Sequence, residues 1–166
     1  MVSASPSDRR AVVAALARTA RRLGGLSALE LLTTLHALVV LAGVELTIRW
    51  VPLPRLGGLL GVGLNLAPAR PGAGPVALGE LPPRARRQLI CTRRVADVWP
   101  FSRGPCLRRS LVGGHLIRDL GPAIRIGVAD DHGSPIAHAW LELDERPLEP
   151  VTGFTPFQRV PAGDPS

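Results

Sequence analysis

The sequence contains no lysine and no tyrosine, and all 20 of its basic residues are arginine. Without lysine, a phosphate-binding loop that ends in Gly-Lys-Ser/Thr is excluded. The chain has only two cysteines, which excludes a disulfide framework and a cysteine-rich zinc module. Aromatic residues make up only 4% of the chain and no nucleic-acid-binding motif is present, so we expect no nucleic-acid partner.

Long hydrophobic runs are also absent. The most apolar stretch, residues 31–44, is interrupted by His36, whereas a membrane-spanning helix needs about 20 apolar residues. Arginines interrupt residues 11–23, so we predict no signal peptide. We therefore expect a cytoplasmic protein with reduced thiols, whose apolar helix packs in a core or lies peripherally on a membrane surface or a membrane-bound partner.

The composition is that of a folded protein. Apolar residues make up 46% of the chain, charged residues 20%, and the net charge is +7. The length of 166 residues fits one domain, or one domain with a helical extension. Its 17 prolines and 18 glycines predict short elements.

The first region, residues 1–66, is predicted to be a helical, apolar accessory region. Helical spacing of apolar residues predicts a helix over 8–23. The motif Ser27-Ala-Leu-Glu30 predicts a capping box that opens a second helix, which reaches about residue 43 or 50 before Pro52 and Pro54 stop it. A short helix and a turn are expected within 56–66. Residues 67–79 are rich in glycine and proline and are predicted to be a linker.

The second region, residues 80–157, is predicted to be an α+β core, followed by a disordered tail over 158–166. Residues 82–99 are predicted to form a helix. They begin with two prolines, which the first turn of a helix tolerates, and their apolar residues share one helical face. After a loop over 101–105, a second helix is expected to end at Gly121-Pro122. Alternating apolar residues predict an antiparallel sheet, because turn residues separate the strands. The expected second helix and three strands cover residues 106–120, 123–129, 135–144 and 146–151.

Cys106 lies in the first turn of its predicted helix. Free backbone N–H groups and the helix dipole favour a thiolate there, and Arg103, Arg108 and Arg109 act in the same direction. The alternative is a small buried structural cysteine, which is what most lone cysteines are. Cys91, in the middle of the preceding helix, is expected to be structural.

His138 lies on the predicted strand 135–144, on the same face as Trp140 and Glu142. A cysteine at a helix start and a histidine on the following sheet can form a thiolate–imidazolium pair, although a satisfied core histidine fits the same spacing. The remaining histidines lack metal-ligand spacing, so we expect no metal site. They are His36, His115 and His132.

A catalytic histidine needs an acceptor for its second ring nitrogen. If Asp144 and Glu145 form a two-residue hairpin turn, Trp140 faces Glu149 on the next strand. Glu149 is then a diagonal neighbour of His138, within reach of a long side chain. Two nearer carboxylates are alternatives, the solvated turn residue Asp144 and Glu142, which is expected to be a rim charge.

Three segments together resemble one known family. They are Cys106-Leu-Arg-Arg-Ser-Leu111, Ile124-Arg-Ile-Gly-Val128 and Ala137-His-Ala-Trp-Leu-Glu-Leu-Asp144. This combination resembles the leader peptidases of lasso peptide biosynthesis, which are transglutaminase-like (papain-like) cysteine hydrolases. The resemblance covers residues 84–149, and residues 48–56 resemble the N-terminal half of longer members.

The resemblance implies a transglutaminase-like core in which a helix carries the cysteine and the sheet carries the histidine. It implies a cysteine endopeptidase that removes the leader from a ribosomally made lasso precursor. Cys106 is then the nucleophile, His138 the base and Glu149 the orienting acid, while Trp140 and Arg109 are assigned to substrate binding. We expect no cofactor.

One position departs from the family pattern. Members place the acid about a dozen residues after the histidine, but position 150 is proline and the glutamate stands one residue earlier, at Glu149. Residues 1–79 do not resemble the family's leader-recognition domain, so a separate leader-binding protein and an ATP-dependent cyclase are the expected partners. Two other hypotheses stay open: a weak or inactive scaffold of the same pathway, and a transglutaminase-like acyl transferase or amidase on another peptide.

Overall fold

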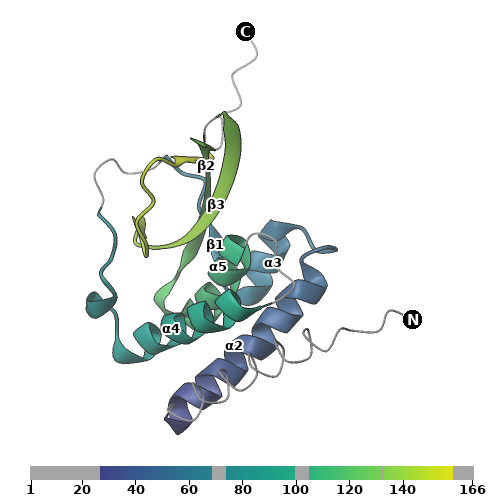
Figure 1. The fold of residues 1–166 in the computed structure, drawn as a ribbon, viewed down its shortest axis with the longest axis vertical. Coiled ribbons are helices and arrows are strands. Elements are labelled where there is room, and N and C mark those ends of the chain that lie inside the picture. Colours follow the sequence, from purple (N-terminus) through teal and green to yellow (C-terminus); the bar gives the residue numbers. More distant parts are fainter. Residues whose placement is uncertain (1–26, 69–73, 100–104, 132, 159–166) are drawn as a thin grey trace, which may run out of the picture.

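A computed structural model describes residues 27–68, 74–99, 105–131 and 133–158 (Figure 1). Within these ranges four α-helices are joined to a mixed sheet, which confirms the predicted α+β class. The helices are α2 (Ala28–Thr47), α3 (Leu53–Leu60), α4 (Pro83–Val98) and α5 (Pro105–Leu116), with 3-10 turns η1 (Leu78–Glu80) and η2 (Arg118–Leu120). The strands are β1 (Gly63–Leu64), β2 (Ala123–Asp131), β3 (Ser134–Leu143), β4 (Arg146–Pro147) and β5 (Thr155–Pro156).

Helix α2 begins where the sequence predicts. The Ser27 hydroxyl accepts the Glu30 backbone N–H at 3.3 Å, and the Glu30 carboxylate accepts the Ser27 N–H at 3.0 Å, so the capping box is formed. The end of α2 falls within the predicted range of 43 to 50 and before both prolines. Helix α2 ends at Thr47, and the two prolines begin α3, with Pro52 at the N-cap position and Pro54 in the first turn, where a missing N–H is tolerated.

One face of α2 is apolar and exposed. Leu32, Val39 and Leu46 follow one another at seven-residue spacing and are 63, 71 and 74% exposed. The opposite face is buried on α4 and α5 through Ala37 and Leu41. By length and composition α2 could cross a membrane, but the same test is passed by a core helix or a signal sequence. Helix α2 therefore presents an exposed apolar surface.

Two predictions on the N-terminal half lie outside the described residues, the helix over 8–23 and part of the linker over 67–79. The short helix expected within 56–66 is present as α3, but it begins earlier, at Leu53, and is followed by Gly61 in the left-handed conformation with φ +70°. The strand β1 that follows was not predicted. It pairs in parallel with β2. The sheet is therefore mixed, whereas we expected a purely antiparallel sheet.

Helix α4 matches its prediction to within one residue at each end. Helix α5 is shorter than predicted, because it ends at Leu116 and the chain continues as η2 before Gly121 turns it at φ +64°. Gly114 lets α5 approach its neighbours closely, since a Cβ there would lie 2.8 Å from the Val62 side chain. Most of the expected loop over 101–105 and of the expected tail over 158–166 lies outside the described residues, and Pro105 already belongs to α5.

The sheet is built around the β2–β3 hairpin, whose register runs from Ala123 opposite Glu142 to Asp131 opposite Ser134. Figure 1 shows this long hairpin extending away from the helices. The predicted third strand was too long, because only Arg146–Pro147 pairs with β3. Strand β5 pairs with β2 and was not predicted, since two paired residues leave no alternation to read.

Helix α5 packs on β2 and β3 with one side and contacts α2 and α4 with the other. Ala139 and Leu141 of β3 point to this helical side and join a core with Leu111 and Val112 of α5. Alternate residues of β3 point to the other side of the sheet, and these include His138 and Trp140. His138 therefore lies on the face of β3 opposite the core around α5, together with the buried Trp140.

Candidate active site

The turn between β3 and β4 sets the register of the candidate site. Asp144 and Glu145 both have positive φ, +50° and +63°, as a two-residue type I′ turn requires. Leu143 consequently pairs with Arg146, and the Leu148 N–H donates to the Leu141 carbonyl at 2.8 Å. Because the ladder stops near this point, Glu149 lies beside His138 at the edge of β3.

His138 and Glu149 are in direct contact. The imidazole Nε2 lies 3.0 Å from Glu149 Oε1. The side chains are 23 and 18% exposed, so the pair is sheltered but not sealed from solvent. The hairpin register predicts this contact. Because Nε2 faces Glu149, Nδ1 is the ring nitrogen that does not contact the carboxylate. Whether Glu149 is a catalytic acid stays a prediction.

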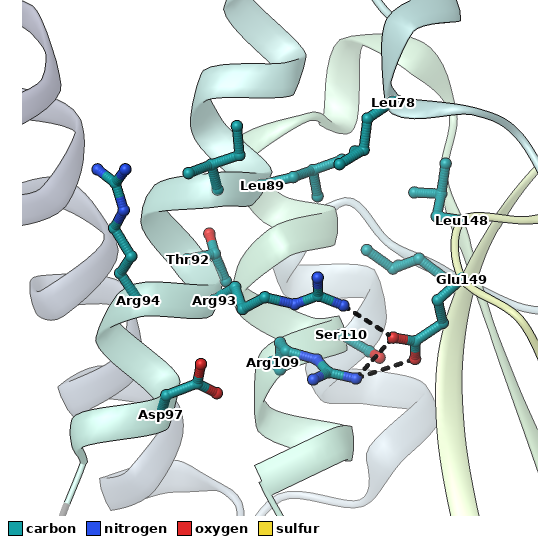
Figure 2. A pocket seen from close by; sticks show the side chains of 12 residues that line it. Leu78, Leu89, Thr92, Arg93, Arg94, Asp97, Arg109, Ser110, Leu148 and Glu149 are labelled. Carbon is teal, nitrogen blue, oxygen red and sulfur yellow. Dashed lines mark hydrogen bonds and ion pairs between the residues drawn. The ribbon is translucent and has the colours of Figure 1, made fainter.

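Two arginines hold the other side of the Glu149 carboxylate. Arg109 Nη2 lies 3.0 Å from Oε1 and 2.7 Å from Oε2, and Arg93 Nη2 lies 3.5 Å from Oε2. Arg109 comes from α5 and Arg93 from α4, so the carboxylate joins two helices to the sheet. Figure 2 shows both arginine side chains directed at Glu149.

Cys106 lies in the first turn of α5, as predicted, and is half-buried. Arg109 is three residues further on and lies on a neighbouring part of the same helix face. Ser110 fixes α5 to the histidine strand, because its hydroxyl donates to the Ala139 carbonyl at 3.1 Å. Among the described residues no hydrogen bond joins Cys106 to His138, so the structure pairs the histidine with the acid but not with the thiol.

The arginines expected to surround Cys106 are paired with carboxylates. Arg108 binds Glu45 of α2 through contacts of 2.5 and 3.2 Å, and Arg109 binds Glu149. The hydrogen bond from Arg108 lowers the pKa of Glu45, against the opposing effect of burial. Arg103 lies outside the described residues. Neighbouring carboxylates therefore partly neutralise the charges of Arg108 and Arg109, two of the three arginines expected near Cys106.

Aromatic rings fix the orientation of His138. Trp140 stacks on it with 6.1 Å between ring centroids, and Phe154 lies 5.1 Å from it on a tilted plane. Gly127, opposite His138 in the register, makes room, since a Cβ there would lie 2.9 Å from the Trp140 ring. Trp140 is only 2% exposed, so the structure shows it supporting the His138 ring. A substrate contact by Trp140 stays a prediction.

Glu142 is not the rim charge that we expected. It is 5% exposed and accepts Arg125 Nε at 2.7 Å and Trp140 Nε1 at 3.1 Å through Oε1. Its Oε2 accepts Asn65 Nδ2 at 2.8 Å. A buried carboxylate needs such a set of donors. Glu142 thus holds Trp140, and through Trp140 the face on which His138 lies.

A pocket of about 340 Å³ opens between α4, α5 and the segment after β4. Its walls are largely apolar, and Arg93, Arg109 and Glu149 lie at one side (Figure 2). Arg109, assigned to substrate binding from the sequence, therefore both lines a pocket and holds Glu149. Its role in binding substrate stays a prediction.

The remaining cysteine and two of the remaining histidines pack within the fold. Cys91 is fully buried, as expected of a structural cysteine, with its Sγ 3.8 Å from the Glu30 carbonyl. The His115 ring packs edge-on against His36 and its Nδ1 lies 2.9 Å from the Leu60 carbonyl. Among the described residues no group of three or more histidine, cysteine or acidic side chains could hold a metal.

Sequence reasoning missed the arginine clamp on Glu149 and the ring of Phe154. The spacing of Arg109 three residues after Cys106 was a usable signal, because it places a cation beside the candidate nucleophile's helix face. Phe154 gave no such signal, since it follows a segment without regular structure.

Comparison with known proteins points to one family. No curated protein and no solved structure matches this chain. A family model described as the transglutaminase-like superfamily matches residues 55–160, which is more than half of the chain. The match includes Cys106, His138 and Glu149, and it begins upstream of the predicted linker. The chain belongs to the transglutaminase-like superfamily, which includes cysteine peptidases and acyltransferases.

Proposed function

We propose that the protein is a cysteine endopeptidase that removes the leader from a ribosomally synthesised lasso peptide precursor. Cys106 is the nucleophile, His138 the general base and acid, and Glu149 the residue that orients the imidazole. The observation that carries this proposal is the 3.0 Å contact between His138 and Glu149, with Glu149 held by an arginine three residues after Cys106 on the same helix.

The contact between His138 Nε2 and Glu149 is compatible with these roles. Nε2 donates to Glu149 in the tautomer that leaves Nδ1 free to accept the Cys106 proton. The thiolate then attacks the scissile carbonyl, and His138 gives its proton to the leaving amine as the C–N bond breaks. Water, deprotonated by His138, attacks the thioester, which releases the leader carboxylate and restores the thiol. Backbone N–H groups in the first turn of α5 are suited to stabilise the oxyanion.

The one-residue displacement of the acid is compatible with this mechanism. Glutamate is longer than aspartate by one methylene group, and Glu149 reaches His138 from outside the strand ladder. The bond from Arg109 fixes the carboxylate in that position. A shortened side chain at 149 would lose this reach.

The proposed partners are a separate leader-binding protein and an ATP-dependent cyclase, with the reaction in the cytoplasm. The exposed apolar face of α2 supports docking of one of them, because contiguous apolar surface of this kind marks interaction sites. In this proposal residues 1–66 form the accessory region, and residues 80–157 form the peptidase core.

The test is alkylation by iodoacetamide followed by peptide mass spectrometry, in the wild type and in His138→Ala. Cys91 is the internal control, because it is fully buried. We expect Cys106 to label at neutral pH at least tenfold faster in the wild type than in His138→Ala, and Cys91 to label only after unfolding. Equal labelling of Cys106 in both proteins would contradict a Cys106–His138 pair.

Leader removal is tested separately. A lasso precursor peptide is incubated with the protein and a leader-binding protein, and the products are weighed by mass spectrometry. We expect wild type to release the leader as a free carboxylic acid and Cys106→Ala to release none. A product joined to an added amine would instead identify an acyl transferase. A Cys106 that reacts with iodoacetamide but cleaves no precursor would reject the leader-peptidase proposal alone.

A further inference from the structure

Two hollows meet across α4. The first is the pocket that ends at Glu149, and the second is lined by Ser27, Glu30 and the N-terminal half of α4. Ile90 and Arg94 line both hollows, so they form one continuous surface, which we call the α4 groove. In Figure 2, Arg93 points toward Glu149 and Arg94 to the opposite side of α4.

The inner end of the α4 groove is apolar and adjoins the candidate site. Leu78, Leu89 and Leu148 line it, and Leu78 is 38% exposed and so available to a ligand. Glu149 closes this end and contacts His138 on its other side. A side chain bound here would lie close to the proposed reaction centre.

The outer part of the groove is cationic. Arg86, Arg87 and Arg94 line it together with a single carboxylate, Glu30, which Ser27 already engages. Arg94 lies 3.8 Å from Glu30, and Arg93 lies 3.5 Å from Glu149; both arginine side chains are more than half exposed. These guanidinium groups have donors available for another anion.

We propose that the α4 groove binds an acidic, leucine-containing segment of the peptide substrate. Its apolar side chains fill the inner hollow, and its carboxylates lie between the arginines of α4. This inference rests on the proposed peptidase function, because it places that segment beside His138 and Glu149.

The surroundings favour a peptide over other anions. The described residues of α4 include no aromatic ring on which the bases of a nucleic acid could stack. A concave pocket with apolar walls fits a side chain better than a flat membrane surface.

Binding is measured apart from catalysis, on full-length Cys106→Ala protein. The probe is a short fluorescein-labelled peptide of alternating glutamate and leucine, followed by fluorescence anisotropy. We expect the double substitution Arg93→Gln with Arg94→Gln to weaken binding about tenfold, and added salt to weaken binding to the unsubstituted groove. Leu78→Ser is expected to weaken binding severalfold, because it removes part of the apolar wall.

Arg84→Gln is the matched control. Arg84 lies on the same helix and is equally charged, but it lines neither hollow and is 71% exposed. It should bind the probe within twofold of the parent protein. Two further probes, with lysine for glutamate and with serine for leucine, should bind at least tenfold more weakly.

The proposal is overturned if Arg84→Gln weakens binding as much as the double substitution, or if the serine probe binds as well as the leucine probe. It is also overturned if duplex DNA or anionic vesicles bind more tightly and with the same dependence on Arg93 and Arg94. A groove that binds the probe while Cys106 proves inert to iodoacetamide would leave the binding site standing without the peptidase. If Cys106 reacts with iodoacetamide but the groove does not bind the probe, the groove proposal is overturned and the peptidase proposal stands.

Discussion

Glu149 Oε1 lies 3.0 Å from His138 Nε2 and 3.0 Å from Arg109 Nη2, so one carboxylate oxygen serves both an imidazole and a guanidinium. The arginine fixes the carboxylate in place and ties the helix of Cys106 to the strand of His138. Its charge also offsets part of the carboxylate charge that would stabilise an imidazolium. Fixing the carboxylate favours the pair with His138, whereas offsetting its charge weakens the pair. Substitutions at Glu149 and at Arg109 separate these two effects.

Glu149→Gln removes the charge but keeps the size of the side chain. In the proposed mechanism we expect peptide hydrolysis to fall by about 10²–10⁴-fold, because the amide no longer stabilises the imidazolium. Glu149→Asp should fall by a similar factor, since the shorter side chain loses contact with Nε2. Steady-state cleavage of a precursor measures both.

Glu80→Gln is the control for this pair. Glu80 is also bound by an arginine, with 3.2 Å to Arg146 Nη1, but it belongs to η1 and does not contact His138. Cleavage by Glu80→Gln should stay within twofold of wild type. Full activity of both Glu149 variants would remove Glu149 from the mechanism.

Arg109 is proposed as a positioning residue. Arg109→Lys keeps the charge but cannot form the same forked contact, whereas Arg109→Met keeps the length and removes the charge. If positioning dominates, both variants should lower kcat by about tenfold or more with little change in KM. If charge compensation dominates, only Arg109→Met should change the rate, and kcat should rise. The pH–rate profiles of the two variants provide the second readout.

The part of the site that the sequence predicts follows from local rules. The two-residue turn at Asp144 and Glu145 pairs Leu143 with Arg146, and this register returns the chain along β3 to where Glu149 reaches His138. The capping box at Ser27 is equally local. These elements depend on neighbours a few residues apart, so a single sequence contains enough information to place them.

The rest depends on contacts between distant segments. Strand β1 exists because Gly63 pairs with Ala123, and β5 because Thr155 pairs with Val128, and neither has a periodicity of its own. Glu142 looks like a rim charge until Asn65 and Arg125 are brought to it by the fold. The buried partner of a charged residue is a tertiary property, and no pattern along β3 reveals it.

Gly127→Ala tests the close packing behind His138. The added Cβ would lie 2.9 Å from both the Trp140 ring and the Thr155 carbonyl. We expect a loss of about 1–3 kcal/mol in the free energy of unfolding, and a fall in Cys106 alkylation as the His138 ring is displaced. Urea unfolding and iodoacetamide labelling measure the two effects.

Gly58→Ala is the matched control for that substitution. Gly58 lies in α3, and a Cβ there would meet nothing within 4 Å. We expect stability to rise by about 0.5–1 kcal/mol, because alanine favours a helix interior over glycine. If Gly127→Ala were as harmless as Gly58→Ala, the aromatic support of His138 would be looser than the distances imply.

The pair of Arg125 and Glu142 should be costly to break from one side. Their side chains are 1 and 5% exposed, and Arg125→Met would leave the carboxylate without its closest donor. We expect a loss of about 3–5 kcal/mol, and a smaller loss when Glu142→Gln is added, because the buried charge is then removed as well. A double-mutant cycle in urea measures this coupling. Equal losses in the single and double variants would contradict it.

Stability in acid should depend on Glu45. The hydrogen bond from Arg108 lowers the pKa of Glu45 from its ordinary value of 4.5, so folding favours the ionised carboxylate. This contribution is therefore complete at pH values well above 4.5 and is lost as the pH falls through the lowered pKa of the folded state. At pH 7 we expect Glu45→Gln to be about 2 kcal/mol less stable than wild type, with the difference shrinking toward pH 3. Urea unfolding of both proteins across this range measures it. A difference that stays constant with pH would show that Glu45 contributes through packing and not through its charge.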